Sequence, residues 1–385
     1  MGKKVYTVGS LFAGVGGICL GFLGSKNEKA KYKLLWANEI DEYACETYRT
    51  NFKHTLLEGD INYILHPETS DKKEYYEKLH EKILETPVDI LNGGFPCQAF
   101  SIAGEQKGFA DARGNLFLSI IDLIEQLEEK HHKKPRILFL ENVKNLKSHN
   151  NGKTYLVIKS KLEGAGYIIK EEVLNTMYYS ELPQNRERIY IIGFLNKEDA
   201  DRFAFFQELD KYKKEKSAEE RIADIKKILD FSVTDEKYFY TKEKYSTYYV
   251  TQEEYDKQTD KKGGRINLDE DINEMYQFYQ LRRGQYVRKN QSNVCPTLTA
   301  NMGTGGHNVP LILTPEKRVR KLTPAETFKL QGFPIGNGYE LPVKYKGKAY
   351  GNGHLYKQAG NAVSVPVITL IAKYILNILA ENDSK

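Results

Sequence analysis

The sequence predicts an α/β fold in which a mostly parallel sheet is covered by helices on both faces. The first observation is a series of short, nearly continuous apolar runs, which are typical of buried parallel strands. These runs lie at residues 5–11, 34–37, 88–91, 136–140 and 188–194. The second observation is helical periodicity between the runs. Leu116, Ile120 and Ile124 share one helix face, and residues 155–162 form another apolar stripe that ends near Gly164, where a C-terminal cap is expected.

The composition is that of a globular protein. With 385 residues, the chain can form one large core and a second, smaller module. Apolar residues make up 40% and charged residues 28%, which argues against disorder. The net charge of +5 is compatible with a polyanionic partner but does not require one.

The N-terminus and the apolar content of the chain bear on its compartment. No apolar run approaches the length needed to span a bilayer. Residues 1–4 lead straight into the first expected strand, without the apolar core and cleavage site of a signal peptide. We therefore expect a cytoplasmic protein with no membrane partner.

The four cysteines form neither a metal-binding nor a disulfide pattern. Cys19, Cys45, Cys97 and Cys295 include no C-x-x-C pair, and no His/Cys cluster has zinc-like spacing. We therefore expect no metal site and no disulfide framework. A lone cysteine is usually a small buried hydrophobe, and this interpretation is kept for all of them except Cys97.

The strand–helix alternation fades after Phe194, which predicts a second domain. Residues 237–255 are rich in Tyr, Thr and Lys and contain almost no aliphatic side chains. Apolar residues at helical spacing return at 368–379, and we expect this helix to pack back on the first domain. The expected division is a first domain at residues 1–225, completed by residues 350–385, and a second domain with a hinge at residues 226–349.

A glycine-rich loop at residues 11–17 follows the first expected strand and precedes a helix. Glycines there let the backbone approach a ligand, with helix N-terminal amides pointing at it. Glu39 ends the next strand, where a carboxylate typically holds ribose hydroxyls, and Asp60 ends the third. Cys19 occupies the third glycine position of the dinucleotide fingerprint, which counts against NAD. The loop suits a cofactor with ribose and adenine but no pyrophosphate, although a purely structural turn explains the loop alone about as well.

Cys97 is a candidate nucleophile because of its setting. The segment at residues 93–101 follows the strand expected at 88–91. Cys97 comes directly after Pro96 in a glycine-rich turn, at the carboxyl end of that strand. The sites of α/β proteins are built at such strand ends.

Blocks of the sequence resemble the motifs of the bacterial DNA (cytosine-5)-methyltransferases of type II restriction–modification systems. They are the loop at 12–17, the catalytic loop at 93–104 with 111–117, the acidic motif at 139–143, the arginine motif at 184–190, the scaffold motif at 320–334 and the last motif at 358–363. The blocks occur in the family's order and cover most of the chain except residues 200–290. The resemblance implies a Rossmann-like S-adenosylmethionine-dependent methyltransferase domain with a mixed, mostly parallel sheet, and a smaller target-recognition domain at the second position.

The resemblance assigns the chemistry to three residues. Cys97 adds to C6 of a cytosine, which makes C5 nucleophilic toward an electrophilic methyl group. Glu141 protonates N3, and Arg188 stabilises the charge that develops at O2. Taken alone, Glu141 also fits a helix cap and Arg188 a solvated edge, but the ordered set of blocks favours catalysis. No residue is assigned to remove the C5 proton, for which water is a candidate.

The resemblance also implies a binding site for S-adenosylmethionine. Its expected residues are Phe12, Gly14, Gly16, Glu39, Ile40, Asp60, Ile61 and Asn361. Asn361 comes from the far end of the chain, so the site requires the C-terminal return expected above.

The expected substrate is double-stranded DNA, whose target base must be flipped out of the stack for this chemistry. Gln98 and Ser101 follow Cys97 and are expected to hold phosphate or to fill the gap. The loop at 101–115 is expected to close over DNA. Arg186 is expected to support the site or to contact DNA.

Sequence recognition is expected at residues 237–308, which include the stretch that matches the family least. Arg282, Arg283 and Arg288 are the expected DNA contacts, although a solvated basic loop explains each one nearly as well. Cys295 lies in a segment that resembles the end of the family's recognition region and is expected to be structural.

Three alternatives stand beside DNA methylation. A tRNA cytosine-5 methyltransferase of the same fold would share the active site, but the Tyr- and Lys-rich insert favours DNA. A Rossmann dehydrogenase fails on the third glycine position and leaves residues 96–98 without a role. An inactive DNA-binding member is disfavoured by intact Cys97, Glu141 and Arg188. We therefore expect a monomeric cytoplasmic enzyme, associated with the nucleoid through its DNA, and a restriction endonuclease as a separate partner.

Overall fold

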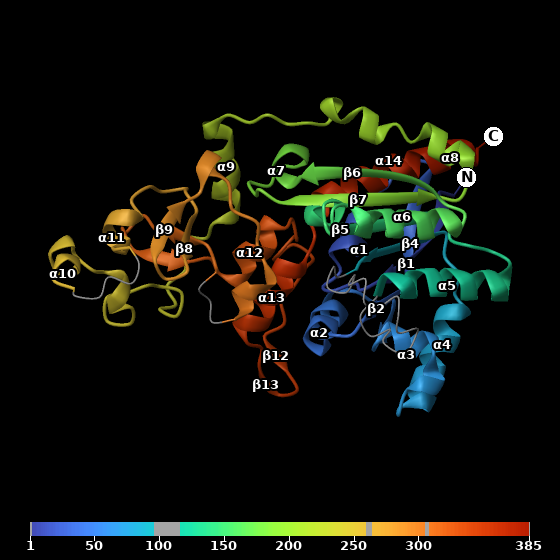
Figure 1. Cartoon of the computed structure of the whole chain (residues 1–385), viewed down its shortest axis with the longest axis horizontal. Coiled ribbons are helices and arrows are strands. Elements are labelled where there is room, and N and C mark those ends of the chain that lie inside the picture. Colours follow the sequence, from blue (N-terminus) through green and yellow to red (C-terminus); the bar gives the residue numbers. More distant parts are fainter. Residues whose placement is uncertain (1, 96–115, 259–263, 305–307, 385) are drawn as a thin grey trace. The chain divides into compact units, whose positions relative to one another are not determined.

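The computed structural model describes residues 2–95, 116–258, 264–304 and 308–384. The chain forms two compact units, whose elements are labelled in Figure 1. The first unit consists of Met1–Asn175, Glu187–Lys213 and Val363–Lys385, and the second consists of Thr176–Arg186 and Lys214–Ala362.

A seven-stranded sheet forms the centre of the first unit, in the order β3-β2-β1-β4-β5-β7-β6. The strands are β1 (Lys4–Leu11), β2 (Ala30–Glu39), β3 (Thr55–Glu58), β4 (Ile90–Gly94), β5 (Ile137–Val143), β6 (Ile168–Asn175) and β7 (Glu187–Phe194). Strands β1 to β5 pair in parallel, and β7 pairs antiparallel with both β5 and β6. This mixed, mostly parallel sheet confirms the predicted fold class.

Alternating side chains of β5 show that helices cover both faces of this sheet. The ring of Phe139 packs on Phe22 of α1 (Gly17–Gly24), with ring centroids 5.3 Å apart. Leu138 and Leu140 instead join the buried cluster that contains Ile120 of α5 (Leu116–His131). The other helices of the unit are α2 (Glu42–Asn51), α3 (Ile61–Leu65), α4 (Lys73–Leu84), α6 (Lys153–Gly164), α8 (Lys197–Arg202) and α14 (Val365–Asn382).

The C-terminal helix α14 returns to the first unit, as predicted. Ile368 lies against Gly21 of α1, and the Tyr32 hydroxyl of β2 donates to the Ala372 carbonyl at 2.9 Å. By length and composition alone, the segment Asn352–Asn382 is apolar enough to cross a membrane, contrary to the expectation from the sequence, and its most apolar stretch is 67% buried. Burial of α14 against α1 and β2 is the pattern of a core helix.

The edge strand β6 lies outside the predicted strands. Lys170, Glu171 and Glu172 stand in its middle, so it lacks the continuous apolar run of the buried strands. A strand at a sheet edge needs less apolar surface, and charged side chains there limit pairing with other chains. Its pairing with β7 runs from Ile168 to Asn175.

The second unit is built around a four-stranded antiparallel sheet in the order β11-β10-β8-β9. Its strands are β8 (Tyr279–Arg282), β9 (Tyr286–Lys289), β10 (Leu311–Leu313) and β11 (Val319–Lys321), with a separate hairpin of β12 (Lys344–Tyr345) and β13 (Lys348–Ala349). The helices are α7 (Thr176–Tyr179), α9 (Ala218–Ile228), α10 (Gln252–Asp256), α11 (Leu268–Asp271), α12 (Pro324–Leu330) and α13 (Asn352–Asn361). Tyr279 and Leu281 lie in its buried core, and Tyr245 and Tyr248 of the tyrosine-rich stretch pack against this core.

The two units differ from the predicted domains in three places. Three segments belong to the second unit, whereas the predicted boundaries assigned them to the first: residues 214–225, which include most of α9, residues 350–362, which include α13, and Thr176–Arg186. Helix α13 is held there because the Tyr356 hydroxyl donates to the Leu322 carbonyl at 2.6 Å. The segment Thr176–Arg186 is held there because the Asn185 N–H donates to the Cys295 carbonyl at 2.8 Å.

Candidate active site

The glycine-rich loop follows β1 at the carboxyl end of the parallel strands. It leaves the strand at Phe12, whose φ is 52°, and continues through Gly14 with a φ of 55°. A Cβ on Gly14 would meet nothing within 4 Å, so this side of the turn can admit a ligand. Gly16, with a φ of 83°, is closed, because a Cβ there would lie 2.2 Å from the Phe52 ring. Gly14 therefore provides ligand access, and Gly16 provides close packing.

Glu39 ends β2 beside this loop. One carboxylate oxygen accepts the Gly14 N–H at 2.7 Å, and the other accepts the N–H groups of Ile40 and Asp41, each at 2.8 Å. Burial raises the pKa of this carboxyl, and the three backbone N–H groups oppose that shift. Because each carboxylate oxygen can accept more than one hydrogen bond, Glu39 retains capacity for ribose hydroxyls.

Asn38 is a positioning residue that the sequence motifs did not indicate. Its buried side-chain amide donates to the Leu57 carbonyl at 3.0 Å and to the Gly59 carbonyl at 2.9 Å. The backbone carbonyl of Asn38 accepts the Ala13 N–H at 2.8 Å. Asn38 therefore joins the ends of β1, β2 and β3 into one rim. A polar amide directly before the strand-end glutamate was the available signal for this role.

Asp60 follows β3 on this rim and begins α3. Its Oδ1 accepts both the backbone N–H and the side-chain amide of Asn62, each at 2.9 Å. Of the two predicted isoleucines, Ile40 is 64% exposed, whereas Ile61 is 2% exposed and lies in the core. Ile40 can therefore contact a ligand through its side chain, and Ile61 only through its backbone. Asn361 lies in the second unit, at the end of α13.

The residues of this rim fit S-adenosylmethionine. Glu39 and Asp60 supply carboxylates for polar hydrogens such as those of ribose hydroxyls, and the exposed Ile40 and half-buried Phe12 supply apolar contacts for an adenine ring. None of the predicted rim residues is basic. A pyrophosphate group would favour a basic residue there. The rim thus matches a cofactor with ribose and adenine but no pyrophosphate.

Glu141 and Arg188 form an ion pair at the carboxyl end of β5. Arg188 Nε lies 3.1 Å from Glu141 Oε1, and the two side chains are 12% and 9% exposed. They come from the adjacent antiparallel strands β5 and β7. A Cβ on Gly94 would lie 3.5 Å from Glu141 Oε2. The carboxylate therefore lies beside the end of β4, where the chain leads toward Cys97.

Asn142 fixes the backbone at the end of β4. Its buried side-chain nitrogen donates to the Phe95 carbonyl at 2.7 Å, while its Oδ1 accepts the Val143 N–H at 2.8 Å. The Phe95 ring is buried as well and packs on Phe117 of α5, with ring centroids 5.5 Å apart. Both the carbonyl and the ring of Phe95 are therefore held in place. The family motif contains Asn142, but its role was not predicted.

The predicted nucleophile Cys97 lies outside the described residues, as do Gln98, Ser101 and the loop at 101–115. The other three cysteines are buried, and burial raises the pKa of each thiol. A raised pKa disfavours the reactive thiolate, so these three have the structural character that was predicted. Among the described residues, no group of His, Cys, Asp and Glu side chains has the arrangement of a metal site.

Arg186, for which support or DNA contact was expected, is buried in the second unit. It is 2% exposed, and its guanidinium donates to the carbonyls of Leu298 at 2.8 Å, of Gly360 at 3.3 Å and of Ala362. A guanidinium directed at carbonyls of its own unit is not presented to a phosphate. The geometry therefore favours the supporting role over a DNA contact.

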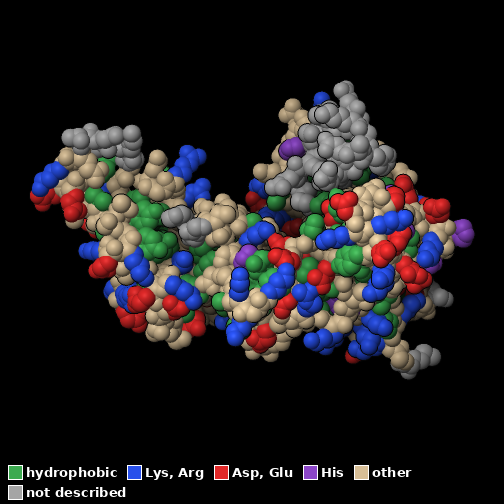
Figure 2. Space-filling model, turned by 90° about the horizontal axis from the view of Figure 1, so that it is seen from below, with side chains coloured by type: hydrophobic (Ala, Val, Ile, Leu, Met, Phe, Trp, Pro, Cys, Tyr) green, Lys and Arg blue, Asp and Glu red, His purple; other side chains and the backbone are tan. Residues whose placement is uncertain are grey.

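The three predicted arginine contacts lie on the hairpin formed by β8 and β9. Arg282 ends β8, Arg283 stands at the turn with a φ of 54°, and Arg288 lies in β9. Arg283 and Arg288 are exposed, and Arg282 is half-buried. Charges of both signs are interspersed over the face of the molecule in Figure 2. The three predicted contacts therefore share one hairpin, and the face in Figure 2 shows no large basic patch.

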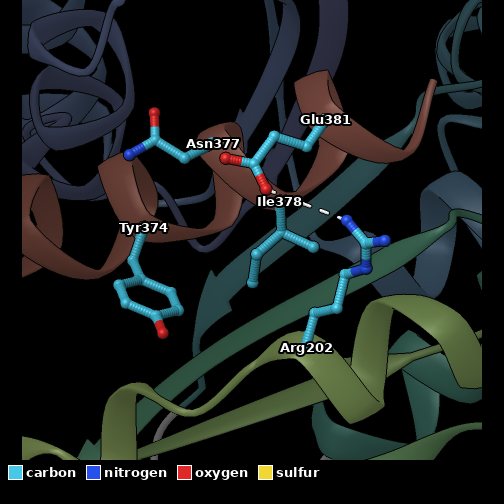
Figure 3. Close-up of a pocket in the computed structure, with 5 residues that line it drawn as sticks. All are labelled: Arg202, Tyr374, Asn377, Ile378 and Glu381. Atoms are coloured by element: carbon cyan, nitrogen blue, oxygen red, sulfur yellow. Dashed lines mark ion pairs between the residues drawn. The ribbon is translucent and has the colours of Figure 1, made fainter. Parts of the chain in front are cut away.

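Figure 3 shows a surface hollow between α8 and α14. Contacts of α14 and its end with Lys4 and Asn27 place it near the amino ends of β1 and β2. It is lined by Arg202, Tyr374, Asn377, Ile378 and Glu381. Arg202 Nη1 lies 3.8 Å from Glu381 Oε2, a weak pair because this distance is long and Glu381 is largely solvated. This lining contains no nucleophile and no buried polar group, so the hollow is not the candidate site.

The fold and the rim define a class, the Rossmann-like S-adenosylmethionine-dependent methyltransferases. Residues 6–377 match the family model described as C-5 cytosine-specific DNA methylase, and the chain belongs to this family. It is 43% identical to the type II methyltransferase M.Bsp6I of Bacillus sp. (strain RFL6), over 96% of this chain and 98% of that protein. It is 34% identical to the type II methyltransferase M.NlaX of Neisseria lactamica, over 99% of this chain and 100% of that protein.

Among solved structures, the Dnmt2 methyltransferase of S. pombe is similar, with a TM-score of 0.60 and 16% sequence identity over 98% of this chain and 99% of that chain. This likeness supports the fold alone. Together with family membership, the comparisons identify a DNA (cytosine-5)-methyltransferase that uses S-adenosylmethionine and acts on DNA. The dehydrogenase alternative is thereby excluded.

Proposed function

We propose that this enzyme methylates cytosine within one short sequence of double-stranded DNA, through a covalent bond between Cys97 and C6 of the flipped base. The Glu141–Arg188 pair carries the proposal. It is buried at the carboxyl end of β5, and its carboxylate lies beside Gly94, where the chain leads to Cys97. A candidate proton donor and a cation thus lie together at the strand end from which the chain continues to the predicted nucleophile.

In the proposed mechanism each group has one task. The Cys97 thiolate forms a bond to C6, while Glu141 gives a proton to N3 and Arg188 donates to O2, so that electron density moves to C5. S-Adenosylmethionine, when bound, supplies the electrophilic methyl group. Water then takes the proton from C5, the C6–S bond breaks to return the thiolate, and N3 returns its proton to Glu141.

The ion pair explains how Glu141 can become an acid when the base arrives. Before substrate binds, Arg188 Nε lies 3.1 Å from Glu141 Oε1. When Arg188 turns a donor to O2, Glu141 loses part of its counter-charge within a buried site. A proton that the carboxyl takes up from solvent can then pass to N3.

For the cofactor, we assign the ribose hydroxyls to Glu39, and close backbone approach to Gly14. Asp60 supplies a second carboxylate, and Phe12 and Ile40 supply apolar contacts. The remaining predicted contacts are Gly16, Ile61 and Asn361.

For the DNA, we assign the target-recognition role to the second unit and the contacts to Arg282, Arg283 and Arg288, with Gln98 and Ser101 near the flipped base. The relatives are named type II methyltransferases. We therefore propose that a restriction endonuclease of the same specificity acts separately from this enzyme. We further propose that the enzyme works as a monomer on DNA of the nucleoid in the cytoplasm.

Mapping of 5-methylcytosine at base resolution tests the proposal. Unmethylated plasmid incubated with the wild-type enzyme and S-adenosylmethionine should carry 5-methylcytosine at one short motif. Cys97→Ala should leave the plasmid unmodified and still bind S-adenosylhomocysteine, which separates loss of chemistry from loss of folding. Unmodified DNA after incubation with the wild-type enzyme would contradict the proposal, and tRNA would then be the substrate to test.

A further inference from the structure

The β8–β9 hairpin has one apolar face and one polar face. Leu281 points into the buried core of the second unit, and its cross-strand partner Val287 packs against that core. Side chains alternate between the faces of a strand, and direct cross-strand partners share a face. The polar face therefore carries Gln280, Arg282, Tyr286 and Arg288.

On the polar face, Gln280 and Arg288 form a side-chain pair. They are direct cross-strand partners, and the Arg288 guanidinium donates to Gln280 Oε1. Arg288 is exposed, and within the described residues it has no ion pair, whereas the next residue, Lys289, pairs with Glu274 at 2.6 Å. The amide of Gln280 restricts the guanidinium plane and leaves most of its five N–H donors for another partner.

We propose that Arg288 reads a guanine of the target sequence and that Gln280 orients its guanidinium for this contact. The proposal rests on the proposed function of the chain as a sequence-specific DNA methyltransferase. Guanine presents O6 and N7 as adjacent acceptors in the major groove, and one arginine fork can bind both. A two-stranded β ribbon fits that groove, and the polar face of this ribbon is the one turned away from the core.

The pairing with Gln280 distinguishes base reading from a phosphate contact. A phosphate attracts a positive charge from many directions, so a contact with the DNA backbone can form without a fixed guanidinium plane, although an arginine fork can also bind a phosphate bidentately. Arg283, exposed at the turn, suits such a contact. Two parallel hydrogen bonds to one base do need a fixed plane. Gln280 provides it without a charge of its own, so Arg288 keeps its full positive charge.

Methylation of a DNA library with randomised bases around the target cytosine tests this proposal. Arg288→Lys keeps the charge but removes the fork, so we expect a roughly ten- to hundredfold loss of preference for guanine at one position, with the other preferences retained. Gln280→Ala should weaken the same preference by a smaller factor. Lys289→Ala, the neighbour on the opposite face, is the matched control and should keep the wild-type motif.

Two outcomes separate this proposal from the proposed function. An Arg288→Lys enzyme that methylates with the full wild-type preference would overturn guanine reading and leave the methyltransferase assignment intact. A wild-type enzyme that methylates no library member would contradict the proposed function itself.

A second measurement uses only the wild-type enzyme. 7-Deazaguanine lacks the N7 acceptor, and placing it at the guanine that Arg288 reads should lower kcat/KM about tenfold. Unchanged kcat/KM with 7-deazaguanine at each guanine of the motif in turn would also overturn guanine reading by Arg288.

Discussion

Each unit contains a buried arginine–glutamate pair, and the two pairs differ in geometry. In the second unit, Arg320 and Glu326 are 0% and 1% exposed, and two guanidinium nitrogens donate to the two carboxylate oxygens at 2.8 and 2.7 Å. Backbone and hydroxyl groups at the start of α12 also donate to Glu326. In the first unit, Arg188 approaches Glu141 through Nε, at 3.1 Å, and its Nη1 donates to the carbonyl of the preceding residue.

This difference distinguishes a structural pair from the pair that we propose to be reactive. When a bidentate pair has its oxygens fully engaged, moving either group leaves a buried charge uncompensated. Such a pair can hold the fold but cannot take part in a reaction. A pair that meets through one nitrogen at a strand end can exchange this contact for a substrate atom. Burial of a charged pair therefore does not by itself indicate catalysis, and the geometry of the pair decides.

The largest expected effect is on catalysis at the reactive pair. Glu141→Gln keeps the shape of the side chain but cannot give a proton to N3, so we expect kcat to fall by roughly 10²- to 10⁴-fold. Single-turnover methylation measures this loss, and S-adenosylhomocysteine affinity and melting temperature should change little. The control is Glu187→Gln, a partly exposed neighbour of Arg188. Near-wild-type kcat in Glu141→Gln would remove this residue from the chemistry.

The second effect is on the stability of the structural pair. Glu326→Ala leaves Arg320 as an uncompensated buried charge, and we expect the free energy of unfolding to fall by about 3–5 kcal/mol. Urea denaturation measures it. Glu254→Ala is the matched control, because Glu254 completes the same type of capping box on the exposed helix α10, and its loss should cost much less. Equal losses in the two variants would show that burial of the ion pair does not matter.

The third effect concerns the backbone beside the reactive pair. Asn142→Asp removes the donor to the buried Phe95 carbonyl and adds a negative charge next to Glu141. An unsatisfied buried carbonyl costs about 1–3 kcal/mol, which favours a shift of the Phe95 backbone beside Glu141. Because such misplacement slows the reaction, we expect kcat to fall about 10- to 100-fold. Asn145→Asp, an exposed position nearby, should retain activity. A normal kcat with lowered stability in Asn142→Asp would assign Asn142 to folding alone.

The fourth effect extends the comparison to a buried acid that relies on backbone N–H groups instead of an arginine. Burial raises the pKa of Glu39, so its carboxylate is protonated at a higher pH than that of an exposed glutamate. S-Adenosylhomocysteine affinity should therefore weaken as the pH falls through this raised pKa, since a protonated carboxyl accepts hydrogen bonds from ribose less well. Glu39→Gln should bind about tenfold more weakly at neutral pH and lose this pH dependence. Isothermal titration calorimetry at several pH values measures this affinity. An affinity of the wild-type enzyme that does not change with pH would contradict the assignment of Glu39 to the ribose hydroxyls.

The smallest expected effect is at His54, a base in the same unit. Its Nε2 lies 2.7 Å from the Tyr48 hydroxyl, and burial lowers the pKa of His54 from 6.5 to about 4. The unfolded chain therefore binds a proton more readily than the folded one, and stability should fall as the pH drops from 6.5 to about 4. His54→Gln should flatten this part of the stability profile, whereas His132→Gln, at an exposed position, should not. If stability changed with pH in the same way in the wild type, His54→Gln and His132→Gln, the lowered pKa of His54 would be contradicted.

The sequence predicted the buried elements of the first unit well and its edges less well. Continuous apolar runs indicated β1, β4, β5 and β7, because a strand covered on both faces needs apolar side chains at successive positions. The edge strand β6 escaped this pattern, since its central Lys170, Glu171 and Glu172 face a less buried environment. The unit boundaries near α9 and α13 also differed, because they depend on which core a helix packs against, and amphipathic periodicity shows only that a helix has an apolar face.

What the sequence determined by itself was the fold class, the family and the cofactor, because ordered motifs and strand-end positions are encoded locally along the chain. The reacting groups are predictions made from the same motifs. What only the tertiary structure decided was how those groups are used. Arg186 and Arg188 stand two positions apart in one motif, yet Arg186 is enclosed by carbonyls and Arg188 meets Glu141. Gln280 acquired a role only through its cross-strand partner, Arg288. The physical reason is that charge pairing, burial and hydrogen-bond geometry depend on neighbours that are distant in the chain and meet only in the folded state.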